Sequence, residues 1–138
     1  MSDTKQSTEL FELAKDAMNK AYVPYSKFPV GAAILTAGGK IYSGCNVENA
    51  AYPEGTCAEA GAISSMVLGG DTQIKDIFVI GKGEELVTPC GGCRQKIREF
   101  SSVDTMIHIC GAERVRKSLT MNELLPFSFG PENLEQAS

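Results

Sequence analysis

Three cysteines, divided between two distant segments, set the strongest limit on how this chain can fold. Cys57 begins the motif Cys-Ala-Glu, and Cys90 and Cys93 follow in Pro-Cys-Gly-Gly-Cys. Thiolates are preferred zinc ligands, and a zinc ion held by three protein ligands keeps one position open, as catalytic sites do. Glu59 lies two residues after Cys57, so on a helix it cannot comfortably share the ligand face. We therefore expect Glu59 beside the open position, as a proton carrier.

Composition narrows the class of protein. A chain of 138 residues with 43% hydrophobic content predicts one compact domain over residues 1–138. The net charge of −4 argues against binding to phosphate backbones, so we expect a small free substrate and no nucleic-acid partner. No segment has the apolar length of a signal peptide or a membrane span, which predicts a cytoplasmic protein without a membrane partner. In a reducing cytosol, Cys45 and Cys110 are interpreted as small buried side chains.

Hydrophobic periodicity predicts alternating helices and strands. An amphipathic helix is expected from Leu10 to Ala21, with Ser7 or Thr8 as its N-cap. The later elements are a hairpin over 30–36 and 41–45, a helix over 57–68, a strand over 76–80, a helix over 90–100, strands over 106–110 and 115–119, and a short helix after Thr120. This order indicates an α/β fold, a three-layer α/β/α sandwich around a mixed sheet of about five strands.

Both cysteine segments fall where a predicted helix begins. Helix N-termini carry free N–H groups and a partial positive charge, which lower thiol pKa values and stabilise anions. Cys90 and Cys93 are three residues apart, so they share one helix face and can hold one ion. A zinc ion with three thiolates has a formal charge of −1, and two helix N-termini would stabilise it.

Five segments of the chain, in order, resemble the small zinc-dependent cytidine deaminases and together span nearly the whole chain. The matching segments are Pro24-Tyr25-Ser26-Lys27-Phe28-Pro29-Val30-Gly31-Ala32-Ala33, Gly44-Cys45-Asn46-Val47-Glu48-Asn49-Ala50-Ala51-Tyr52, Cys57-Ala58-Glu59, Pro89-Cys90-Gly91-Gly92-Cys93-Arg94-Gln95 and Leu124-Leu125-Pro126-Phe127-Ser128-Phe129-Gly130-Pro131. A non-ligand Glu with a downstream Pro-Cys-x-x-Cys is also the signature of zinc nucleobase deaminases. The resemblance implies a cytidine deaminase-like fold and a homotetramer. It also implies a hydrolase of pyrimidine salvage that converts cytidine and 2′-deoxycytidine to uridine and 2′-deoxyuridine with release of ammonia.

The resemblance also implies roles for individual residues. One zinc per chain would be held by Cys57, Cys90 and Cys93, with water as the fourth ligand. Glu59 would then carry protons to N3 of cytosine and to the leaving amine. The implied substrate contacts are Phe28 at the base, Asn46 and Glu48 at the ribose hydroxyls, and Phe129, which reaches the base across a subunit interface. Ala58 is also implied as a substrate contact. A further segment, Ala50, Ala51 and Tyr52, resembles the part that meets neighbouring subunits near the site.

One position departs from the resemblance. Many members carry an Arg directly after the catalytic Glu, where it hydrogen-bonds the zinc thiolates, and this chain has Ala60. Without that charge the zinc is a poorer Lewis acid, unless another group replaces the Arg. Arg94, next to Cys93, is the candidate replacement.

Several other interpretations are open. A structural zinc site would need a fourth ligand, and the single histidine, His108, falls inside a predicted strand, so it receives no role. Asn46 and Glu48 are also compatible with plain loop residues, and Phe28 and Phe129 with core or interface residues. Competing functions are deamination of another aminopyrimidine nucleoside such as blasticidin S, a catalytically silent zinc-binding relative, and polynucleotide editing.

Overall fold

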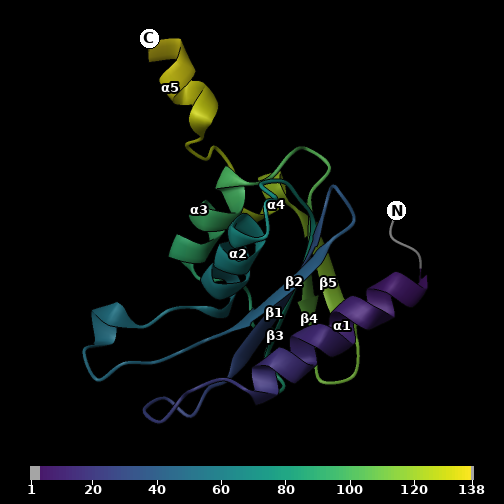
Figure 1. The fold of residues 1–138 in the computed structure, drawn as a ribbon, viewed down its shortest axis with the longest axis vertical. Coiled ribbons are helices and arrows are strands. Elements are labelled where there is room, and N and C mark those ends of the chain that lie inside the picture. Colours follow the sequence, from purple (N-terminus) through teal and green to yellow (C-terminus); the bar gives the residue numbers. More distant parts are fainter. Residues whose placement is uncertain (1–3, 138) are drawn as a thin grey trace.

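A computed structural model describes residues 4–137, and its centre is a mixed β-sheet (Figure 1). In the described chain the strand order is β2-β1-β3-β4-β5. The strands are β1 Val30–Thr36, β2 Ile41–Cys45, β3 Ile74–Gly81, β4 Met106–Cys110 and β5 Val115–Thr120. β3 and β4 run parallel, whereas the other neighbouring pairs are antiparallel. The predicted mixed sheet of five strands is confirmed.

Helices cover both faces of this sheet and give it three layers (Figure 1). The helix α1, Thr4–Asn19, packs Leu10, Phe11 and Ala14 on one face. The helices α2, Ala58–Leu68, and α3, Gly91–Glu99, lie on the other face, where Ala62, Met66 and Ile97 join a second core. The α/β/α sandwich predicted from the sequence is therefore confirmed.

Two glycines let helices lie directly against the first hairpin. A Cβ on Gly31 of β1 would lie within 2.5 Å of the backbone nitrogen of Met18 in α1. On the opposite face, a Cβ on Gly44 of β2 would come within 2.7 Å of the carbonyl oxygen of Ala58 in α2. Real Cβ atoms do not approach backbone this closely, so both positions require glycine. The contact at Gly44 holds the first turn of α2 against the sheet.

Several predicted boundaries were wrong. The described helix α1 already includes Thr4, so Ser7 and Thr8 lie within the helix rather than capping it, and Ala21 lies beyond its end. The apolar face that packs on the sheet outweighs the preference of these hydroxyl residues for caps. β3 begins at Ile74, two residues earlier than predicted, because that side chain is buried in the core.

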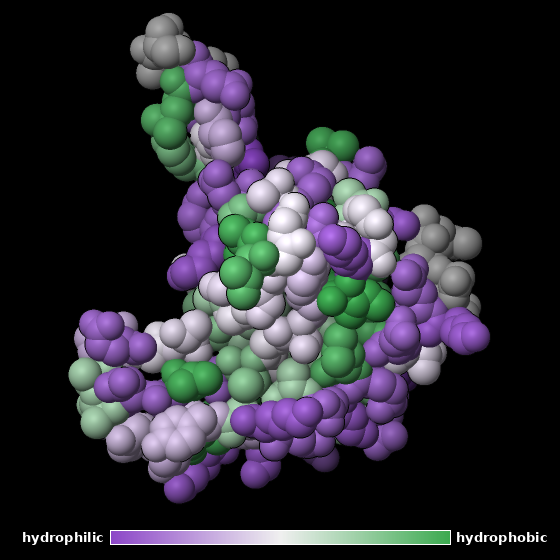
Figure 2. Space-filling model, viewed as in Figure 1, coloured by the Kyte–Doolittle hydropathy of each residue, from purple (hydrophilic) through white to green (hydrophobic). Residues whose placement is uncertain are grey.

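The short helical elements were predicted only in part. The expected helix after Thr120 is α4, Met121–Leu124, and Thr120 and Glu123 form a capping box at its start. A 3₁₀ turn, η1 Tyr52–Glu54, and a last helix, α5 Pro131–Ala137, were not predicted. α5 projects away from the body of the molecule (Figures 1 and 2). None of the described helices combines the length and the apolar character needed to cross a membrane.

Candidate metal centre and adjoining cavity

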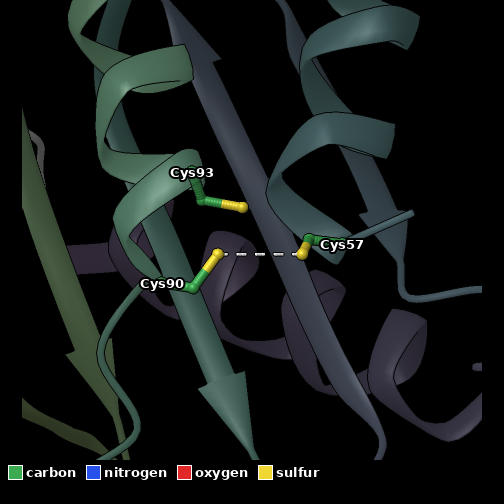
Figure 3. Close-up of side chains that lie close together, drawn as sticks. All are labelled: Cys57, Cys90 and Cys93. Atoms are coloured by element: carbon green, nitrogen blue, oxygen red, sulfur yellow. Dashed lines mark hydrogen bonds between the residues drawn. The ribbon is translucent and has the colours of Figure 1, made fainter. Parts of the chain in front are cut away.

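The three cysteines lie at the adjacent N-termini of α2 and α3 (Figure 3). Cys57 is the N-cap of α2, and its carbonyl accepts a hydrogen bond from the N–H of Gly61 at 3.1 Å. Cys90 is the N-cap of α3, and its carbonyl accepts from the N–H of Arg94 at 2.9 Å. Cys93 follows in the first turn of α3. The prediction that both cysteine segments begin helices is confirmed.

The sulfur atoms have the spacing that a zinc ion requires. The Sγ atoms of Cys57, Cys90 and Cys93 all lie within 4.8 Å of one another, and those of Cys57 and Cys90 are 3.9 Å apart. Zinc–sulfur bonds of about 2.3 Å at tetrahedral angles place two sulfurs about 3.8 Å apart. The side chains point toward a common centre (Figure 3). The donor set is therefore suited to zinc in both chemistry and spacing.

The thiols differ in how readily they ionise. Burial is the main cause that raises the pKa of Cys57 and, more strongly, that of Cys93, and the neighbouring Glu59 adds to both increases. Burial also acts on Cys90, but hydrogen bonds with Cys93 and Cys57 lower its pKa overall. Only the thiol of Cys90 is thus favoured as a thiolate by its protein surroundings. A bound metal ion would stabilise the deprotonated form of the other two.

A cavity of about 190 Å³ lies beside the cysteines. Six of the thirteen residues that the sequence pattern assigned to the site contribute to its wall. The lining residues are Phe28, Val30, Asn46, Cys57, Ala58, Glu59, Val87, Thr88 and Cys90. Val87 and Thr88 were not singled out in the sequence, although they directly precede the Pro-Cys-Gly-Gly-Cys motif and this proximity could have pointed to them.

Glu59 is a buried carboxyl group in this wall. Its residue is only 4% exposed, although it lies in the first turn of α2, where acidic side chains are commonly solvated. Burial is the main cause that raises its pKa, whereas its own backbone N–H, the Cys93 thiol and the charge of Lys96 act in the opposite direction. A carboxyl group whose pKa is raised holds its proton at higher pH than a solvated one, which suits a group that must take up and release protons.

Asn46 and Glu48 both make hydrogen bonds within the protein. Asn46 accepts a bond from the N–H of Val30 at 2.8 Å and donates one to the carbonyl of Phe28 at 3.0 Å. The carboxylate of Glu48 accepts from the N–H groups of Tyr25 and Ser26 at 3.0 and 3.1 Å, and also from the Ser26 hydroxyl. These bonds fix the segment that carries Phe28, a role that the sequence analysis missed.

Glu48 does not line the cavity at the cysteines. It lies in a second cavity of about 390 Å³, together with Tyr25, Ser26, Asn49, Tyr52 and Gly55. The rings of Tyr25 and Tyr52 meet edge to face there, with centroids 6.1 Å apart. Asn46 and Glu48, which the sequence pattern grouped together, therefore face two different cavities of this chain.

Other residues assigned from the sequence lie outside the cavity at the cysteines. Phe129 is 58% exposed, and its carbonyl accepts a hydrogen bond from the side chain of Gln95 at 2.9 Å. Ala50 and Ala51 are exposed, and Tyr52 is 77% exposed. Within one chain, the structure does not bring these residues to the three cysteines.

Arg94 does not make the thiolate contact expected of it. Its guanidinium donates to the carbonyls of Pro89 at 2.9 Å and Leu124 at 2.8 Å, and to the hydroxyl of Thr88 at 3.1 Å. Across the described chain, none of its side-chain hydrogen bonds goes to a cysteine. The three bonds join the loop before Cys90 to the last residue of α4. Arg94 therefore anchors this loop.

Comparison with known proteins gives one consistent family. The family model for the cytidine and deoxycytidylate deaminase zinc-binding region matches residues 4–110. A cytidine deaminase of Sporosarcina psychrophila is 42% identical over 94% of this chain and 96% of its own length. A cytidine deaminase of Halalkalibacterium halodurans is 37% identical over 91% of this chain and 95% of its own.

Solved structures agree with the sequence matches. A crystal structure of cytidine deaminase from Burkholderia pseudomallei has a TM-score of 0.83 and 38% identity, covering 88% of this chain and 98% of that one. The cytidine deaminase from Mycobacterium tuberculosis has a TM-score of 0.78 and 34% identity, covering 93% and 99%. The similarity thus extends over almost the full length of each relative.

Proposed function

The chain belongs to the cytidine and deoxycytidylate deaminase family, and we propose on that basis that it hydrolytically deaminates cytidine and 2′-deoxycytidine to uridine and 2′-deoxyuridine. Ammonia is the second product. The observation that carries this proposal is the buried carboxyl of Glu59 in the same cavity wall as Cys57 and Cys90, beside three sulfurs at zinc spacing. With zinc bound, such a site could activate water and move its protons.

Cys57, Cys90 and Cys93 would hold the zinc, one ion per chain, and when bound this ion lowers the pKa of water and supplies a Lewis acid. Glu59 accepts a proton from the water that attacks C4 and delivers it to N3 of cytosine. The same carboxylate then carries the remaining hydroxyl proton to the exocyclic amine, which departs as ammonia. The raised pKa of Glu59 supports both transfers, because each requires the group to gain and then lose a proton.

Phe28 and Ala58 are proposed to contact the base, and Asn46 and Glu48 the ribose hydroxyls. Phe28, Ala58 and Asn46 line the cavity at the cysteines, which supports their part of the proposal. The Asn46 amide uses one N–H and one lone pair on backbone groups, so one of each is left for a sugar hydroxyl. Glu48 lines the second cavity, and its carboxylate also retains acceptor capacity for a ribose hydroxyl.

We propose further that the protein is a homotetramer whose sites are shared between subunits. Phe129 and the segment Ala50, Ala51 and Tyr52 would then complete a neighbour's cavity. The exposure of Phe129 and Tyr52, together with that of Phe127 and Leu134 near and on the projecting α5, supports this arrangement. Large exposed apolar side chains gathered on projecting segments are typical of interfaces.

The cellular setting is part of the same proposal. A single deaminase domain over residues 1–138 would act on free nucleosides in cytoplasmic pyrimidine salvage. The net charge of −4 supports a small substrate rather than a polynucleotide. Blasticidin S and other aminopyrimidines are not favoured, because the relatives reported above are named cytidine deaminases.

The direct test is the loss of cytosine ultraviolet absorbance when zinc-loaded protein meets cytidine or 2′-deoxycytidine. Wild type should turn over both nucleosides. Glu59→Gln should bind zinc equally but lose about 10²- to 10⁴-fold in rate, the contribution of a positioned acid/base. Glu54→Gln, an exposed acid in the same region of the chain, is the matched control. Zinc binding without turnover of either nucleoside would contradict the proposed substrate.

A further inference from the structure

The proposed zinc site gathers a net negative charge. Three thiolates and the Glu59 carboxylate sum to −4, and a zinc ion reduces this to −2. Ala60, the residue after Glu59, is uncharged. The N-termini of α2 and α3 offset part of the charge through their partial positive ends. A full positive charge near the site would stabilise it further.

The two arginines of α3 form their hydrogen bonds with groups other than the cysteines. Arg94 donates to two carbonyls and one hydroxyl, as described above. Arg98 hydrogen-bonds the hydroxyl of Ser128 and forms an ion pair with Glu132. Neither guanidinium is therefore available to the cysteine cluster.

Lys96 lies on the same helix and extends toward its N-terminus. Helical side chains lean toward the N-terminal turn, and Lys96 follows Gly92 by four residues and Cys93 by three. Its Nζ lies 3.6 Å from the position that a Cβ on Gly92 would occupy, so the ammonium is next to the turn that carries both cysteine ligands. Among the described residues, the ion pairs do not include Lys96.

Solvent exposure makes this position of Lys96 favourable. The side chain is exposed, so it reaches the site without the cost of burying an unpaired ammonium.

We propose that the ammonium of Lys96 offsets the negative charge of the three-cysteine site and thereby strengthens zinc binding. This inference rests on the zinc site of the proposed function. The sign follows from the change of charge on binding: three neutral thiols release three protons and take up one zinc ion, so the site charge changes from 0 to −1, which a nearby cation stabilises. The ammonium lies at the solvent-exposed side of the site, so its effect on zinc affinity is moderate and becomes smaller as the salt concentration rises.

The test is zinc affinity, measured by competition with a chromophoric chelator at low ionic strength. Lys96→Met should weaken zinc binding about three- to tenfold, the range for one partly screened charge. Lys96→Arg should bind zinc nearly as wild type does, and Lys96→Glu should bind more weakly than Lys96→Met. Lys75→Met, a change to an exposed lysine on β3, should leave the affinity unchanged. Circular dichroism of the metal-free proteins checks that each variant folds.

Salt dependence distinguishes charge from shape. In about 0.5 M salt the difference between wild type and Lys96→Met should shrink, because screening acts within a few ångströms there. Equal affinities of wild type and Lys96→Met at low salt would overturn the inference, as would an Arg variant as weak as the Met variant. These readouts do not use deaminase activity. A wild-type protein that binds no zinc would instead contradict the proposed function itself.

Discussion

Asn46 donates a hydrogen bond from its side-chain amide to the backbone carbonyl of Phe28, at 3.0 Å. The same amide accepts a hydrogen bond from the N–H of Val30, so it spans the turn that presents the Phe28 ring to the cavity. An amide that reaches two backbone groups in this way fixes the position of the ring without touching it. Asn46 is thus a structural brace as well as a proposed contact with ribose.

Replacing this brace should affect both stability and substrate affinity. Asn46→Ala leaves a carbonyl and an N–H without partners and should reduce the free energy of unfolding by about 1–3 kcal/mol. KM for cytidine should rise, because both Phe28 and the ribose contact are disturbed. Denaturant unfolding and steady-state kinetics measure the two effects. Asn122→Ala, a change to an exposed residue on α4, is the control. An Asn46→Ala variant with an unchanged free energy of unfolding would contradict the bracing role.

The bonds of Glu48 predict a pH-dependent contribution to stability. Hydrogen bonds from Ser26 are the main cause that lowers the pKa of Glu48 below its usual value of 4.5. A lowered folded-state pKa means that the stabilisation is complete above about pH 4.5 and is lost as pH falls through the folded-state value. Glu48→Gln should therefore be less stable than wild type at pH 7, and the gap should close in acid. A gap that stays constant from pH 7 to the acid limit of folding would count against this account.

Arg94 should be required for the loop that precedes Cys90. Arg94→Ala removes three hydrogen bonds and leaves the carbonyls of Pro89 and Leu124 unpaired, with an expected loss of about 2–3 kcal/mol in stability. Looser placement of Cys90 should also weaken zinc retention, as a chelator assay would show. Arg114→Ala, on an exposed segment, serves as the control. Full zinc retention and unchanged activity in Arg94→Ala would remove Arg94 from any role at the site.

Metal removal should lower thermal stability as well as activity. A ligand that binds only the folded state stabilises it by RT ln(1 + [L]/Kd), about 2.7 kcal/mol at one hundred times Kd. Dialysis against a chelator should lower Tm, and added zinc should restore both Tm and turnover. Cys45→Ser keeps the three sulfurs of the cluster and should respond as wild type does, whereas Cys93→Ser should show little change with zinc.

The shared-site proposal predicts complementation between two inactive variants. Glu59→Gln and Phe129→Ala should each have low activity as pure proteins. After co-refolding, a mixed oligomer can combine Glu59 from one subunit with Phe129 from another, so part of the activity should return. Mixing without subunit exchange is the control. No recovery in mixed oligomers of verified composition, or a fully active monomer by light scattering, would refute the shared site.

The sequence was most informative where structure is local. The hairpin over 30–36 and 41–45 and the two helix starts at the cysteines follow from neighbouring residues, and all were predicted with little error. The bounds of the elements near the two ends of the chain were predicted less accurately. α5 was missed although Pro131 at its first position and Glu132 in its first turn are typical of a helix start.

Contacts between distant segments could not be read from the pattern. Glu48 bonds residues more than twenty positions away, and Arg94 bonds Leu124 thirty positions away. Both depend on how loops fold back, which periodicity does not encode. Lys96 could have been found, because a residue three positions after Cys93 must lean toward it on a helix. The positive charge directly after Cys93 indicated Arg94 instead.

The close contact at Gly44 has a consequence for engineering new substrate selectivity. Because β2 and α2 meet there through backbone atoms, the position of Cys57 does not depend on which side chains fill the neighbouring cavity. A combinatorial library could therefore diversify Val30 and Val87 while Cys57 stays in place. Libraries that vary Gly44 should instead contain few folded members, so this glycine should be kept unchanged in directed evolution.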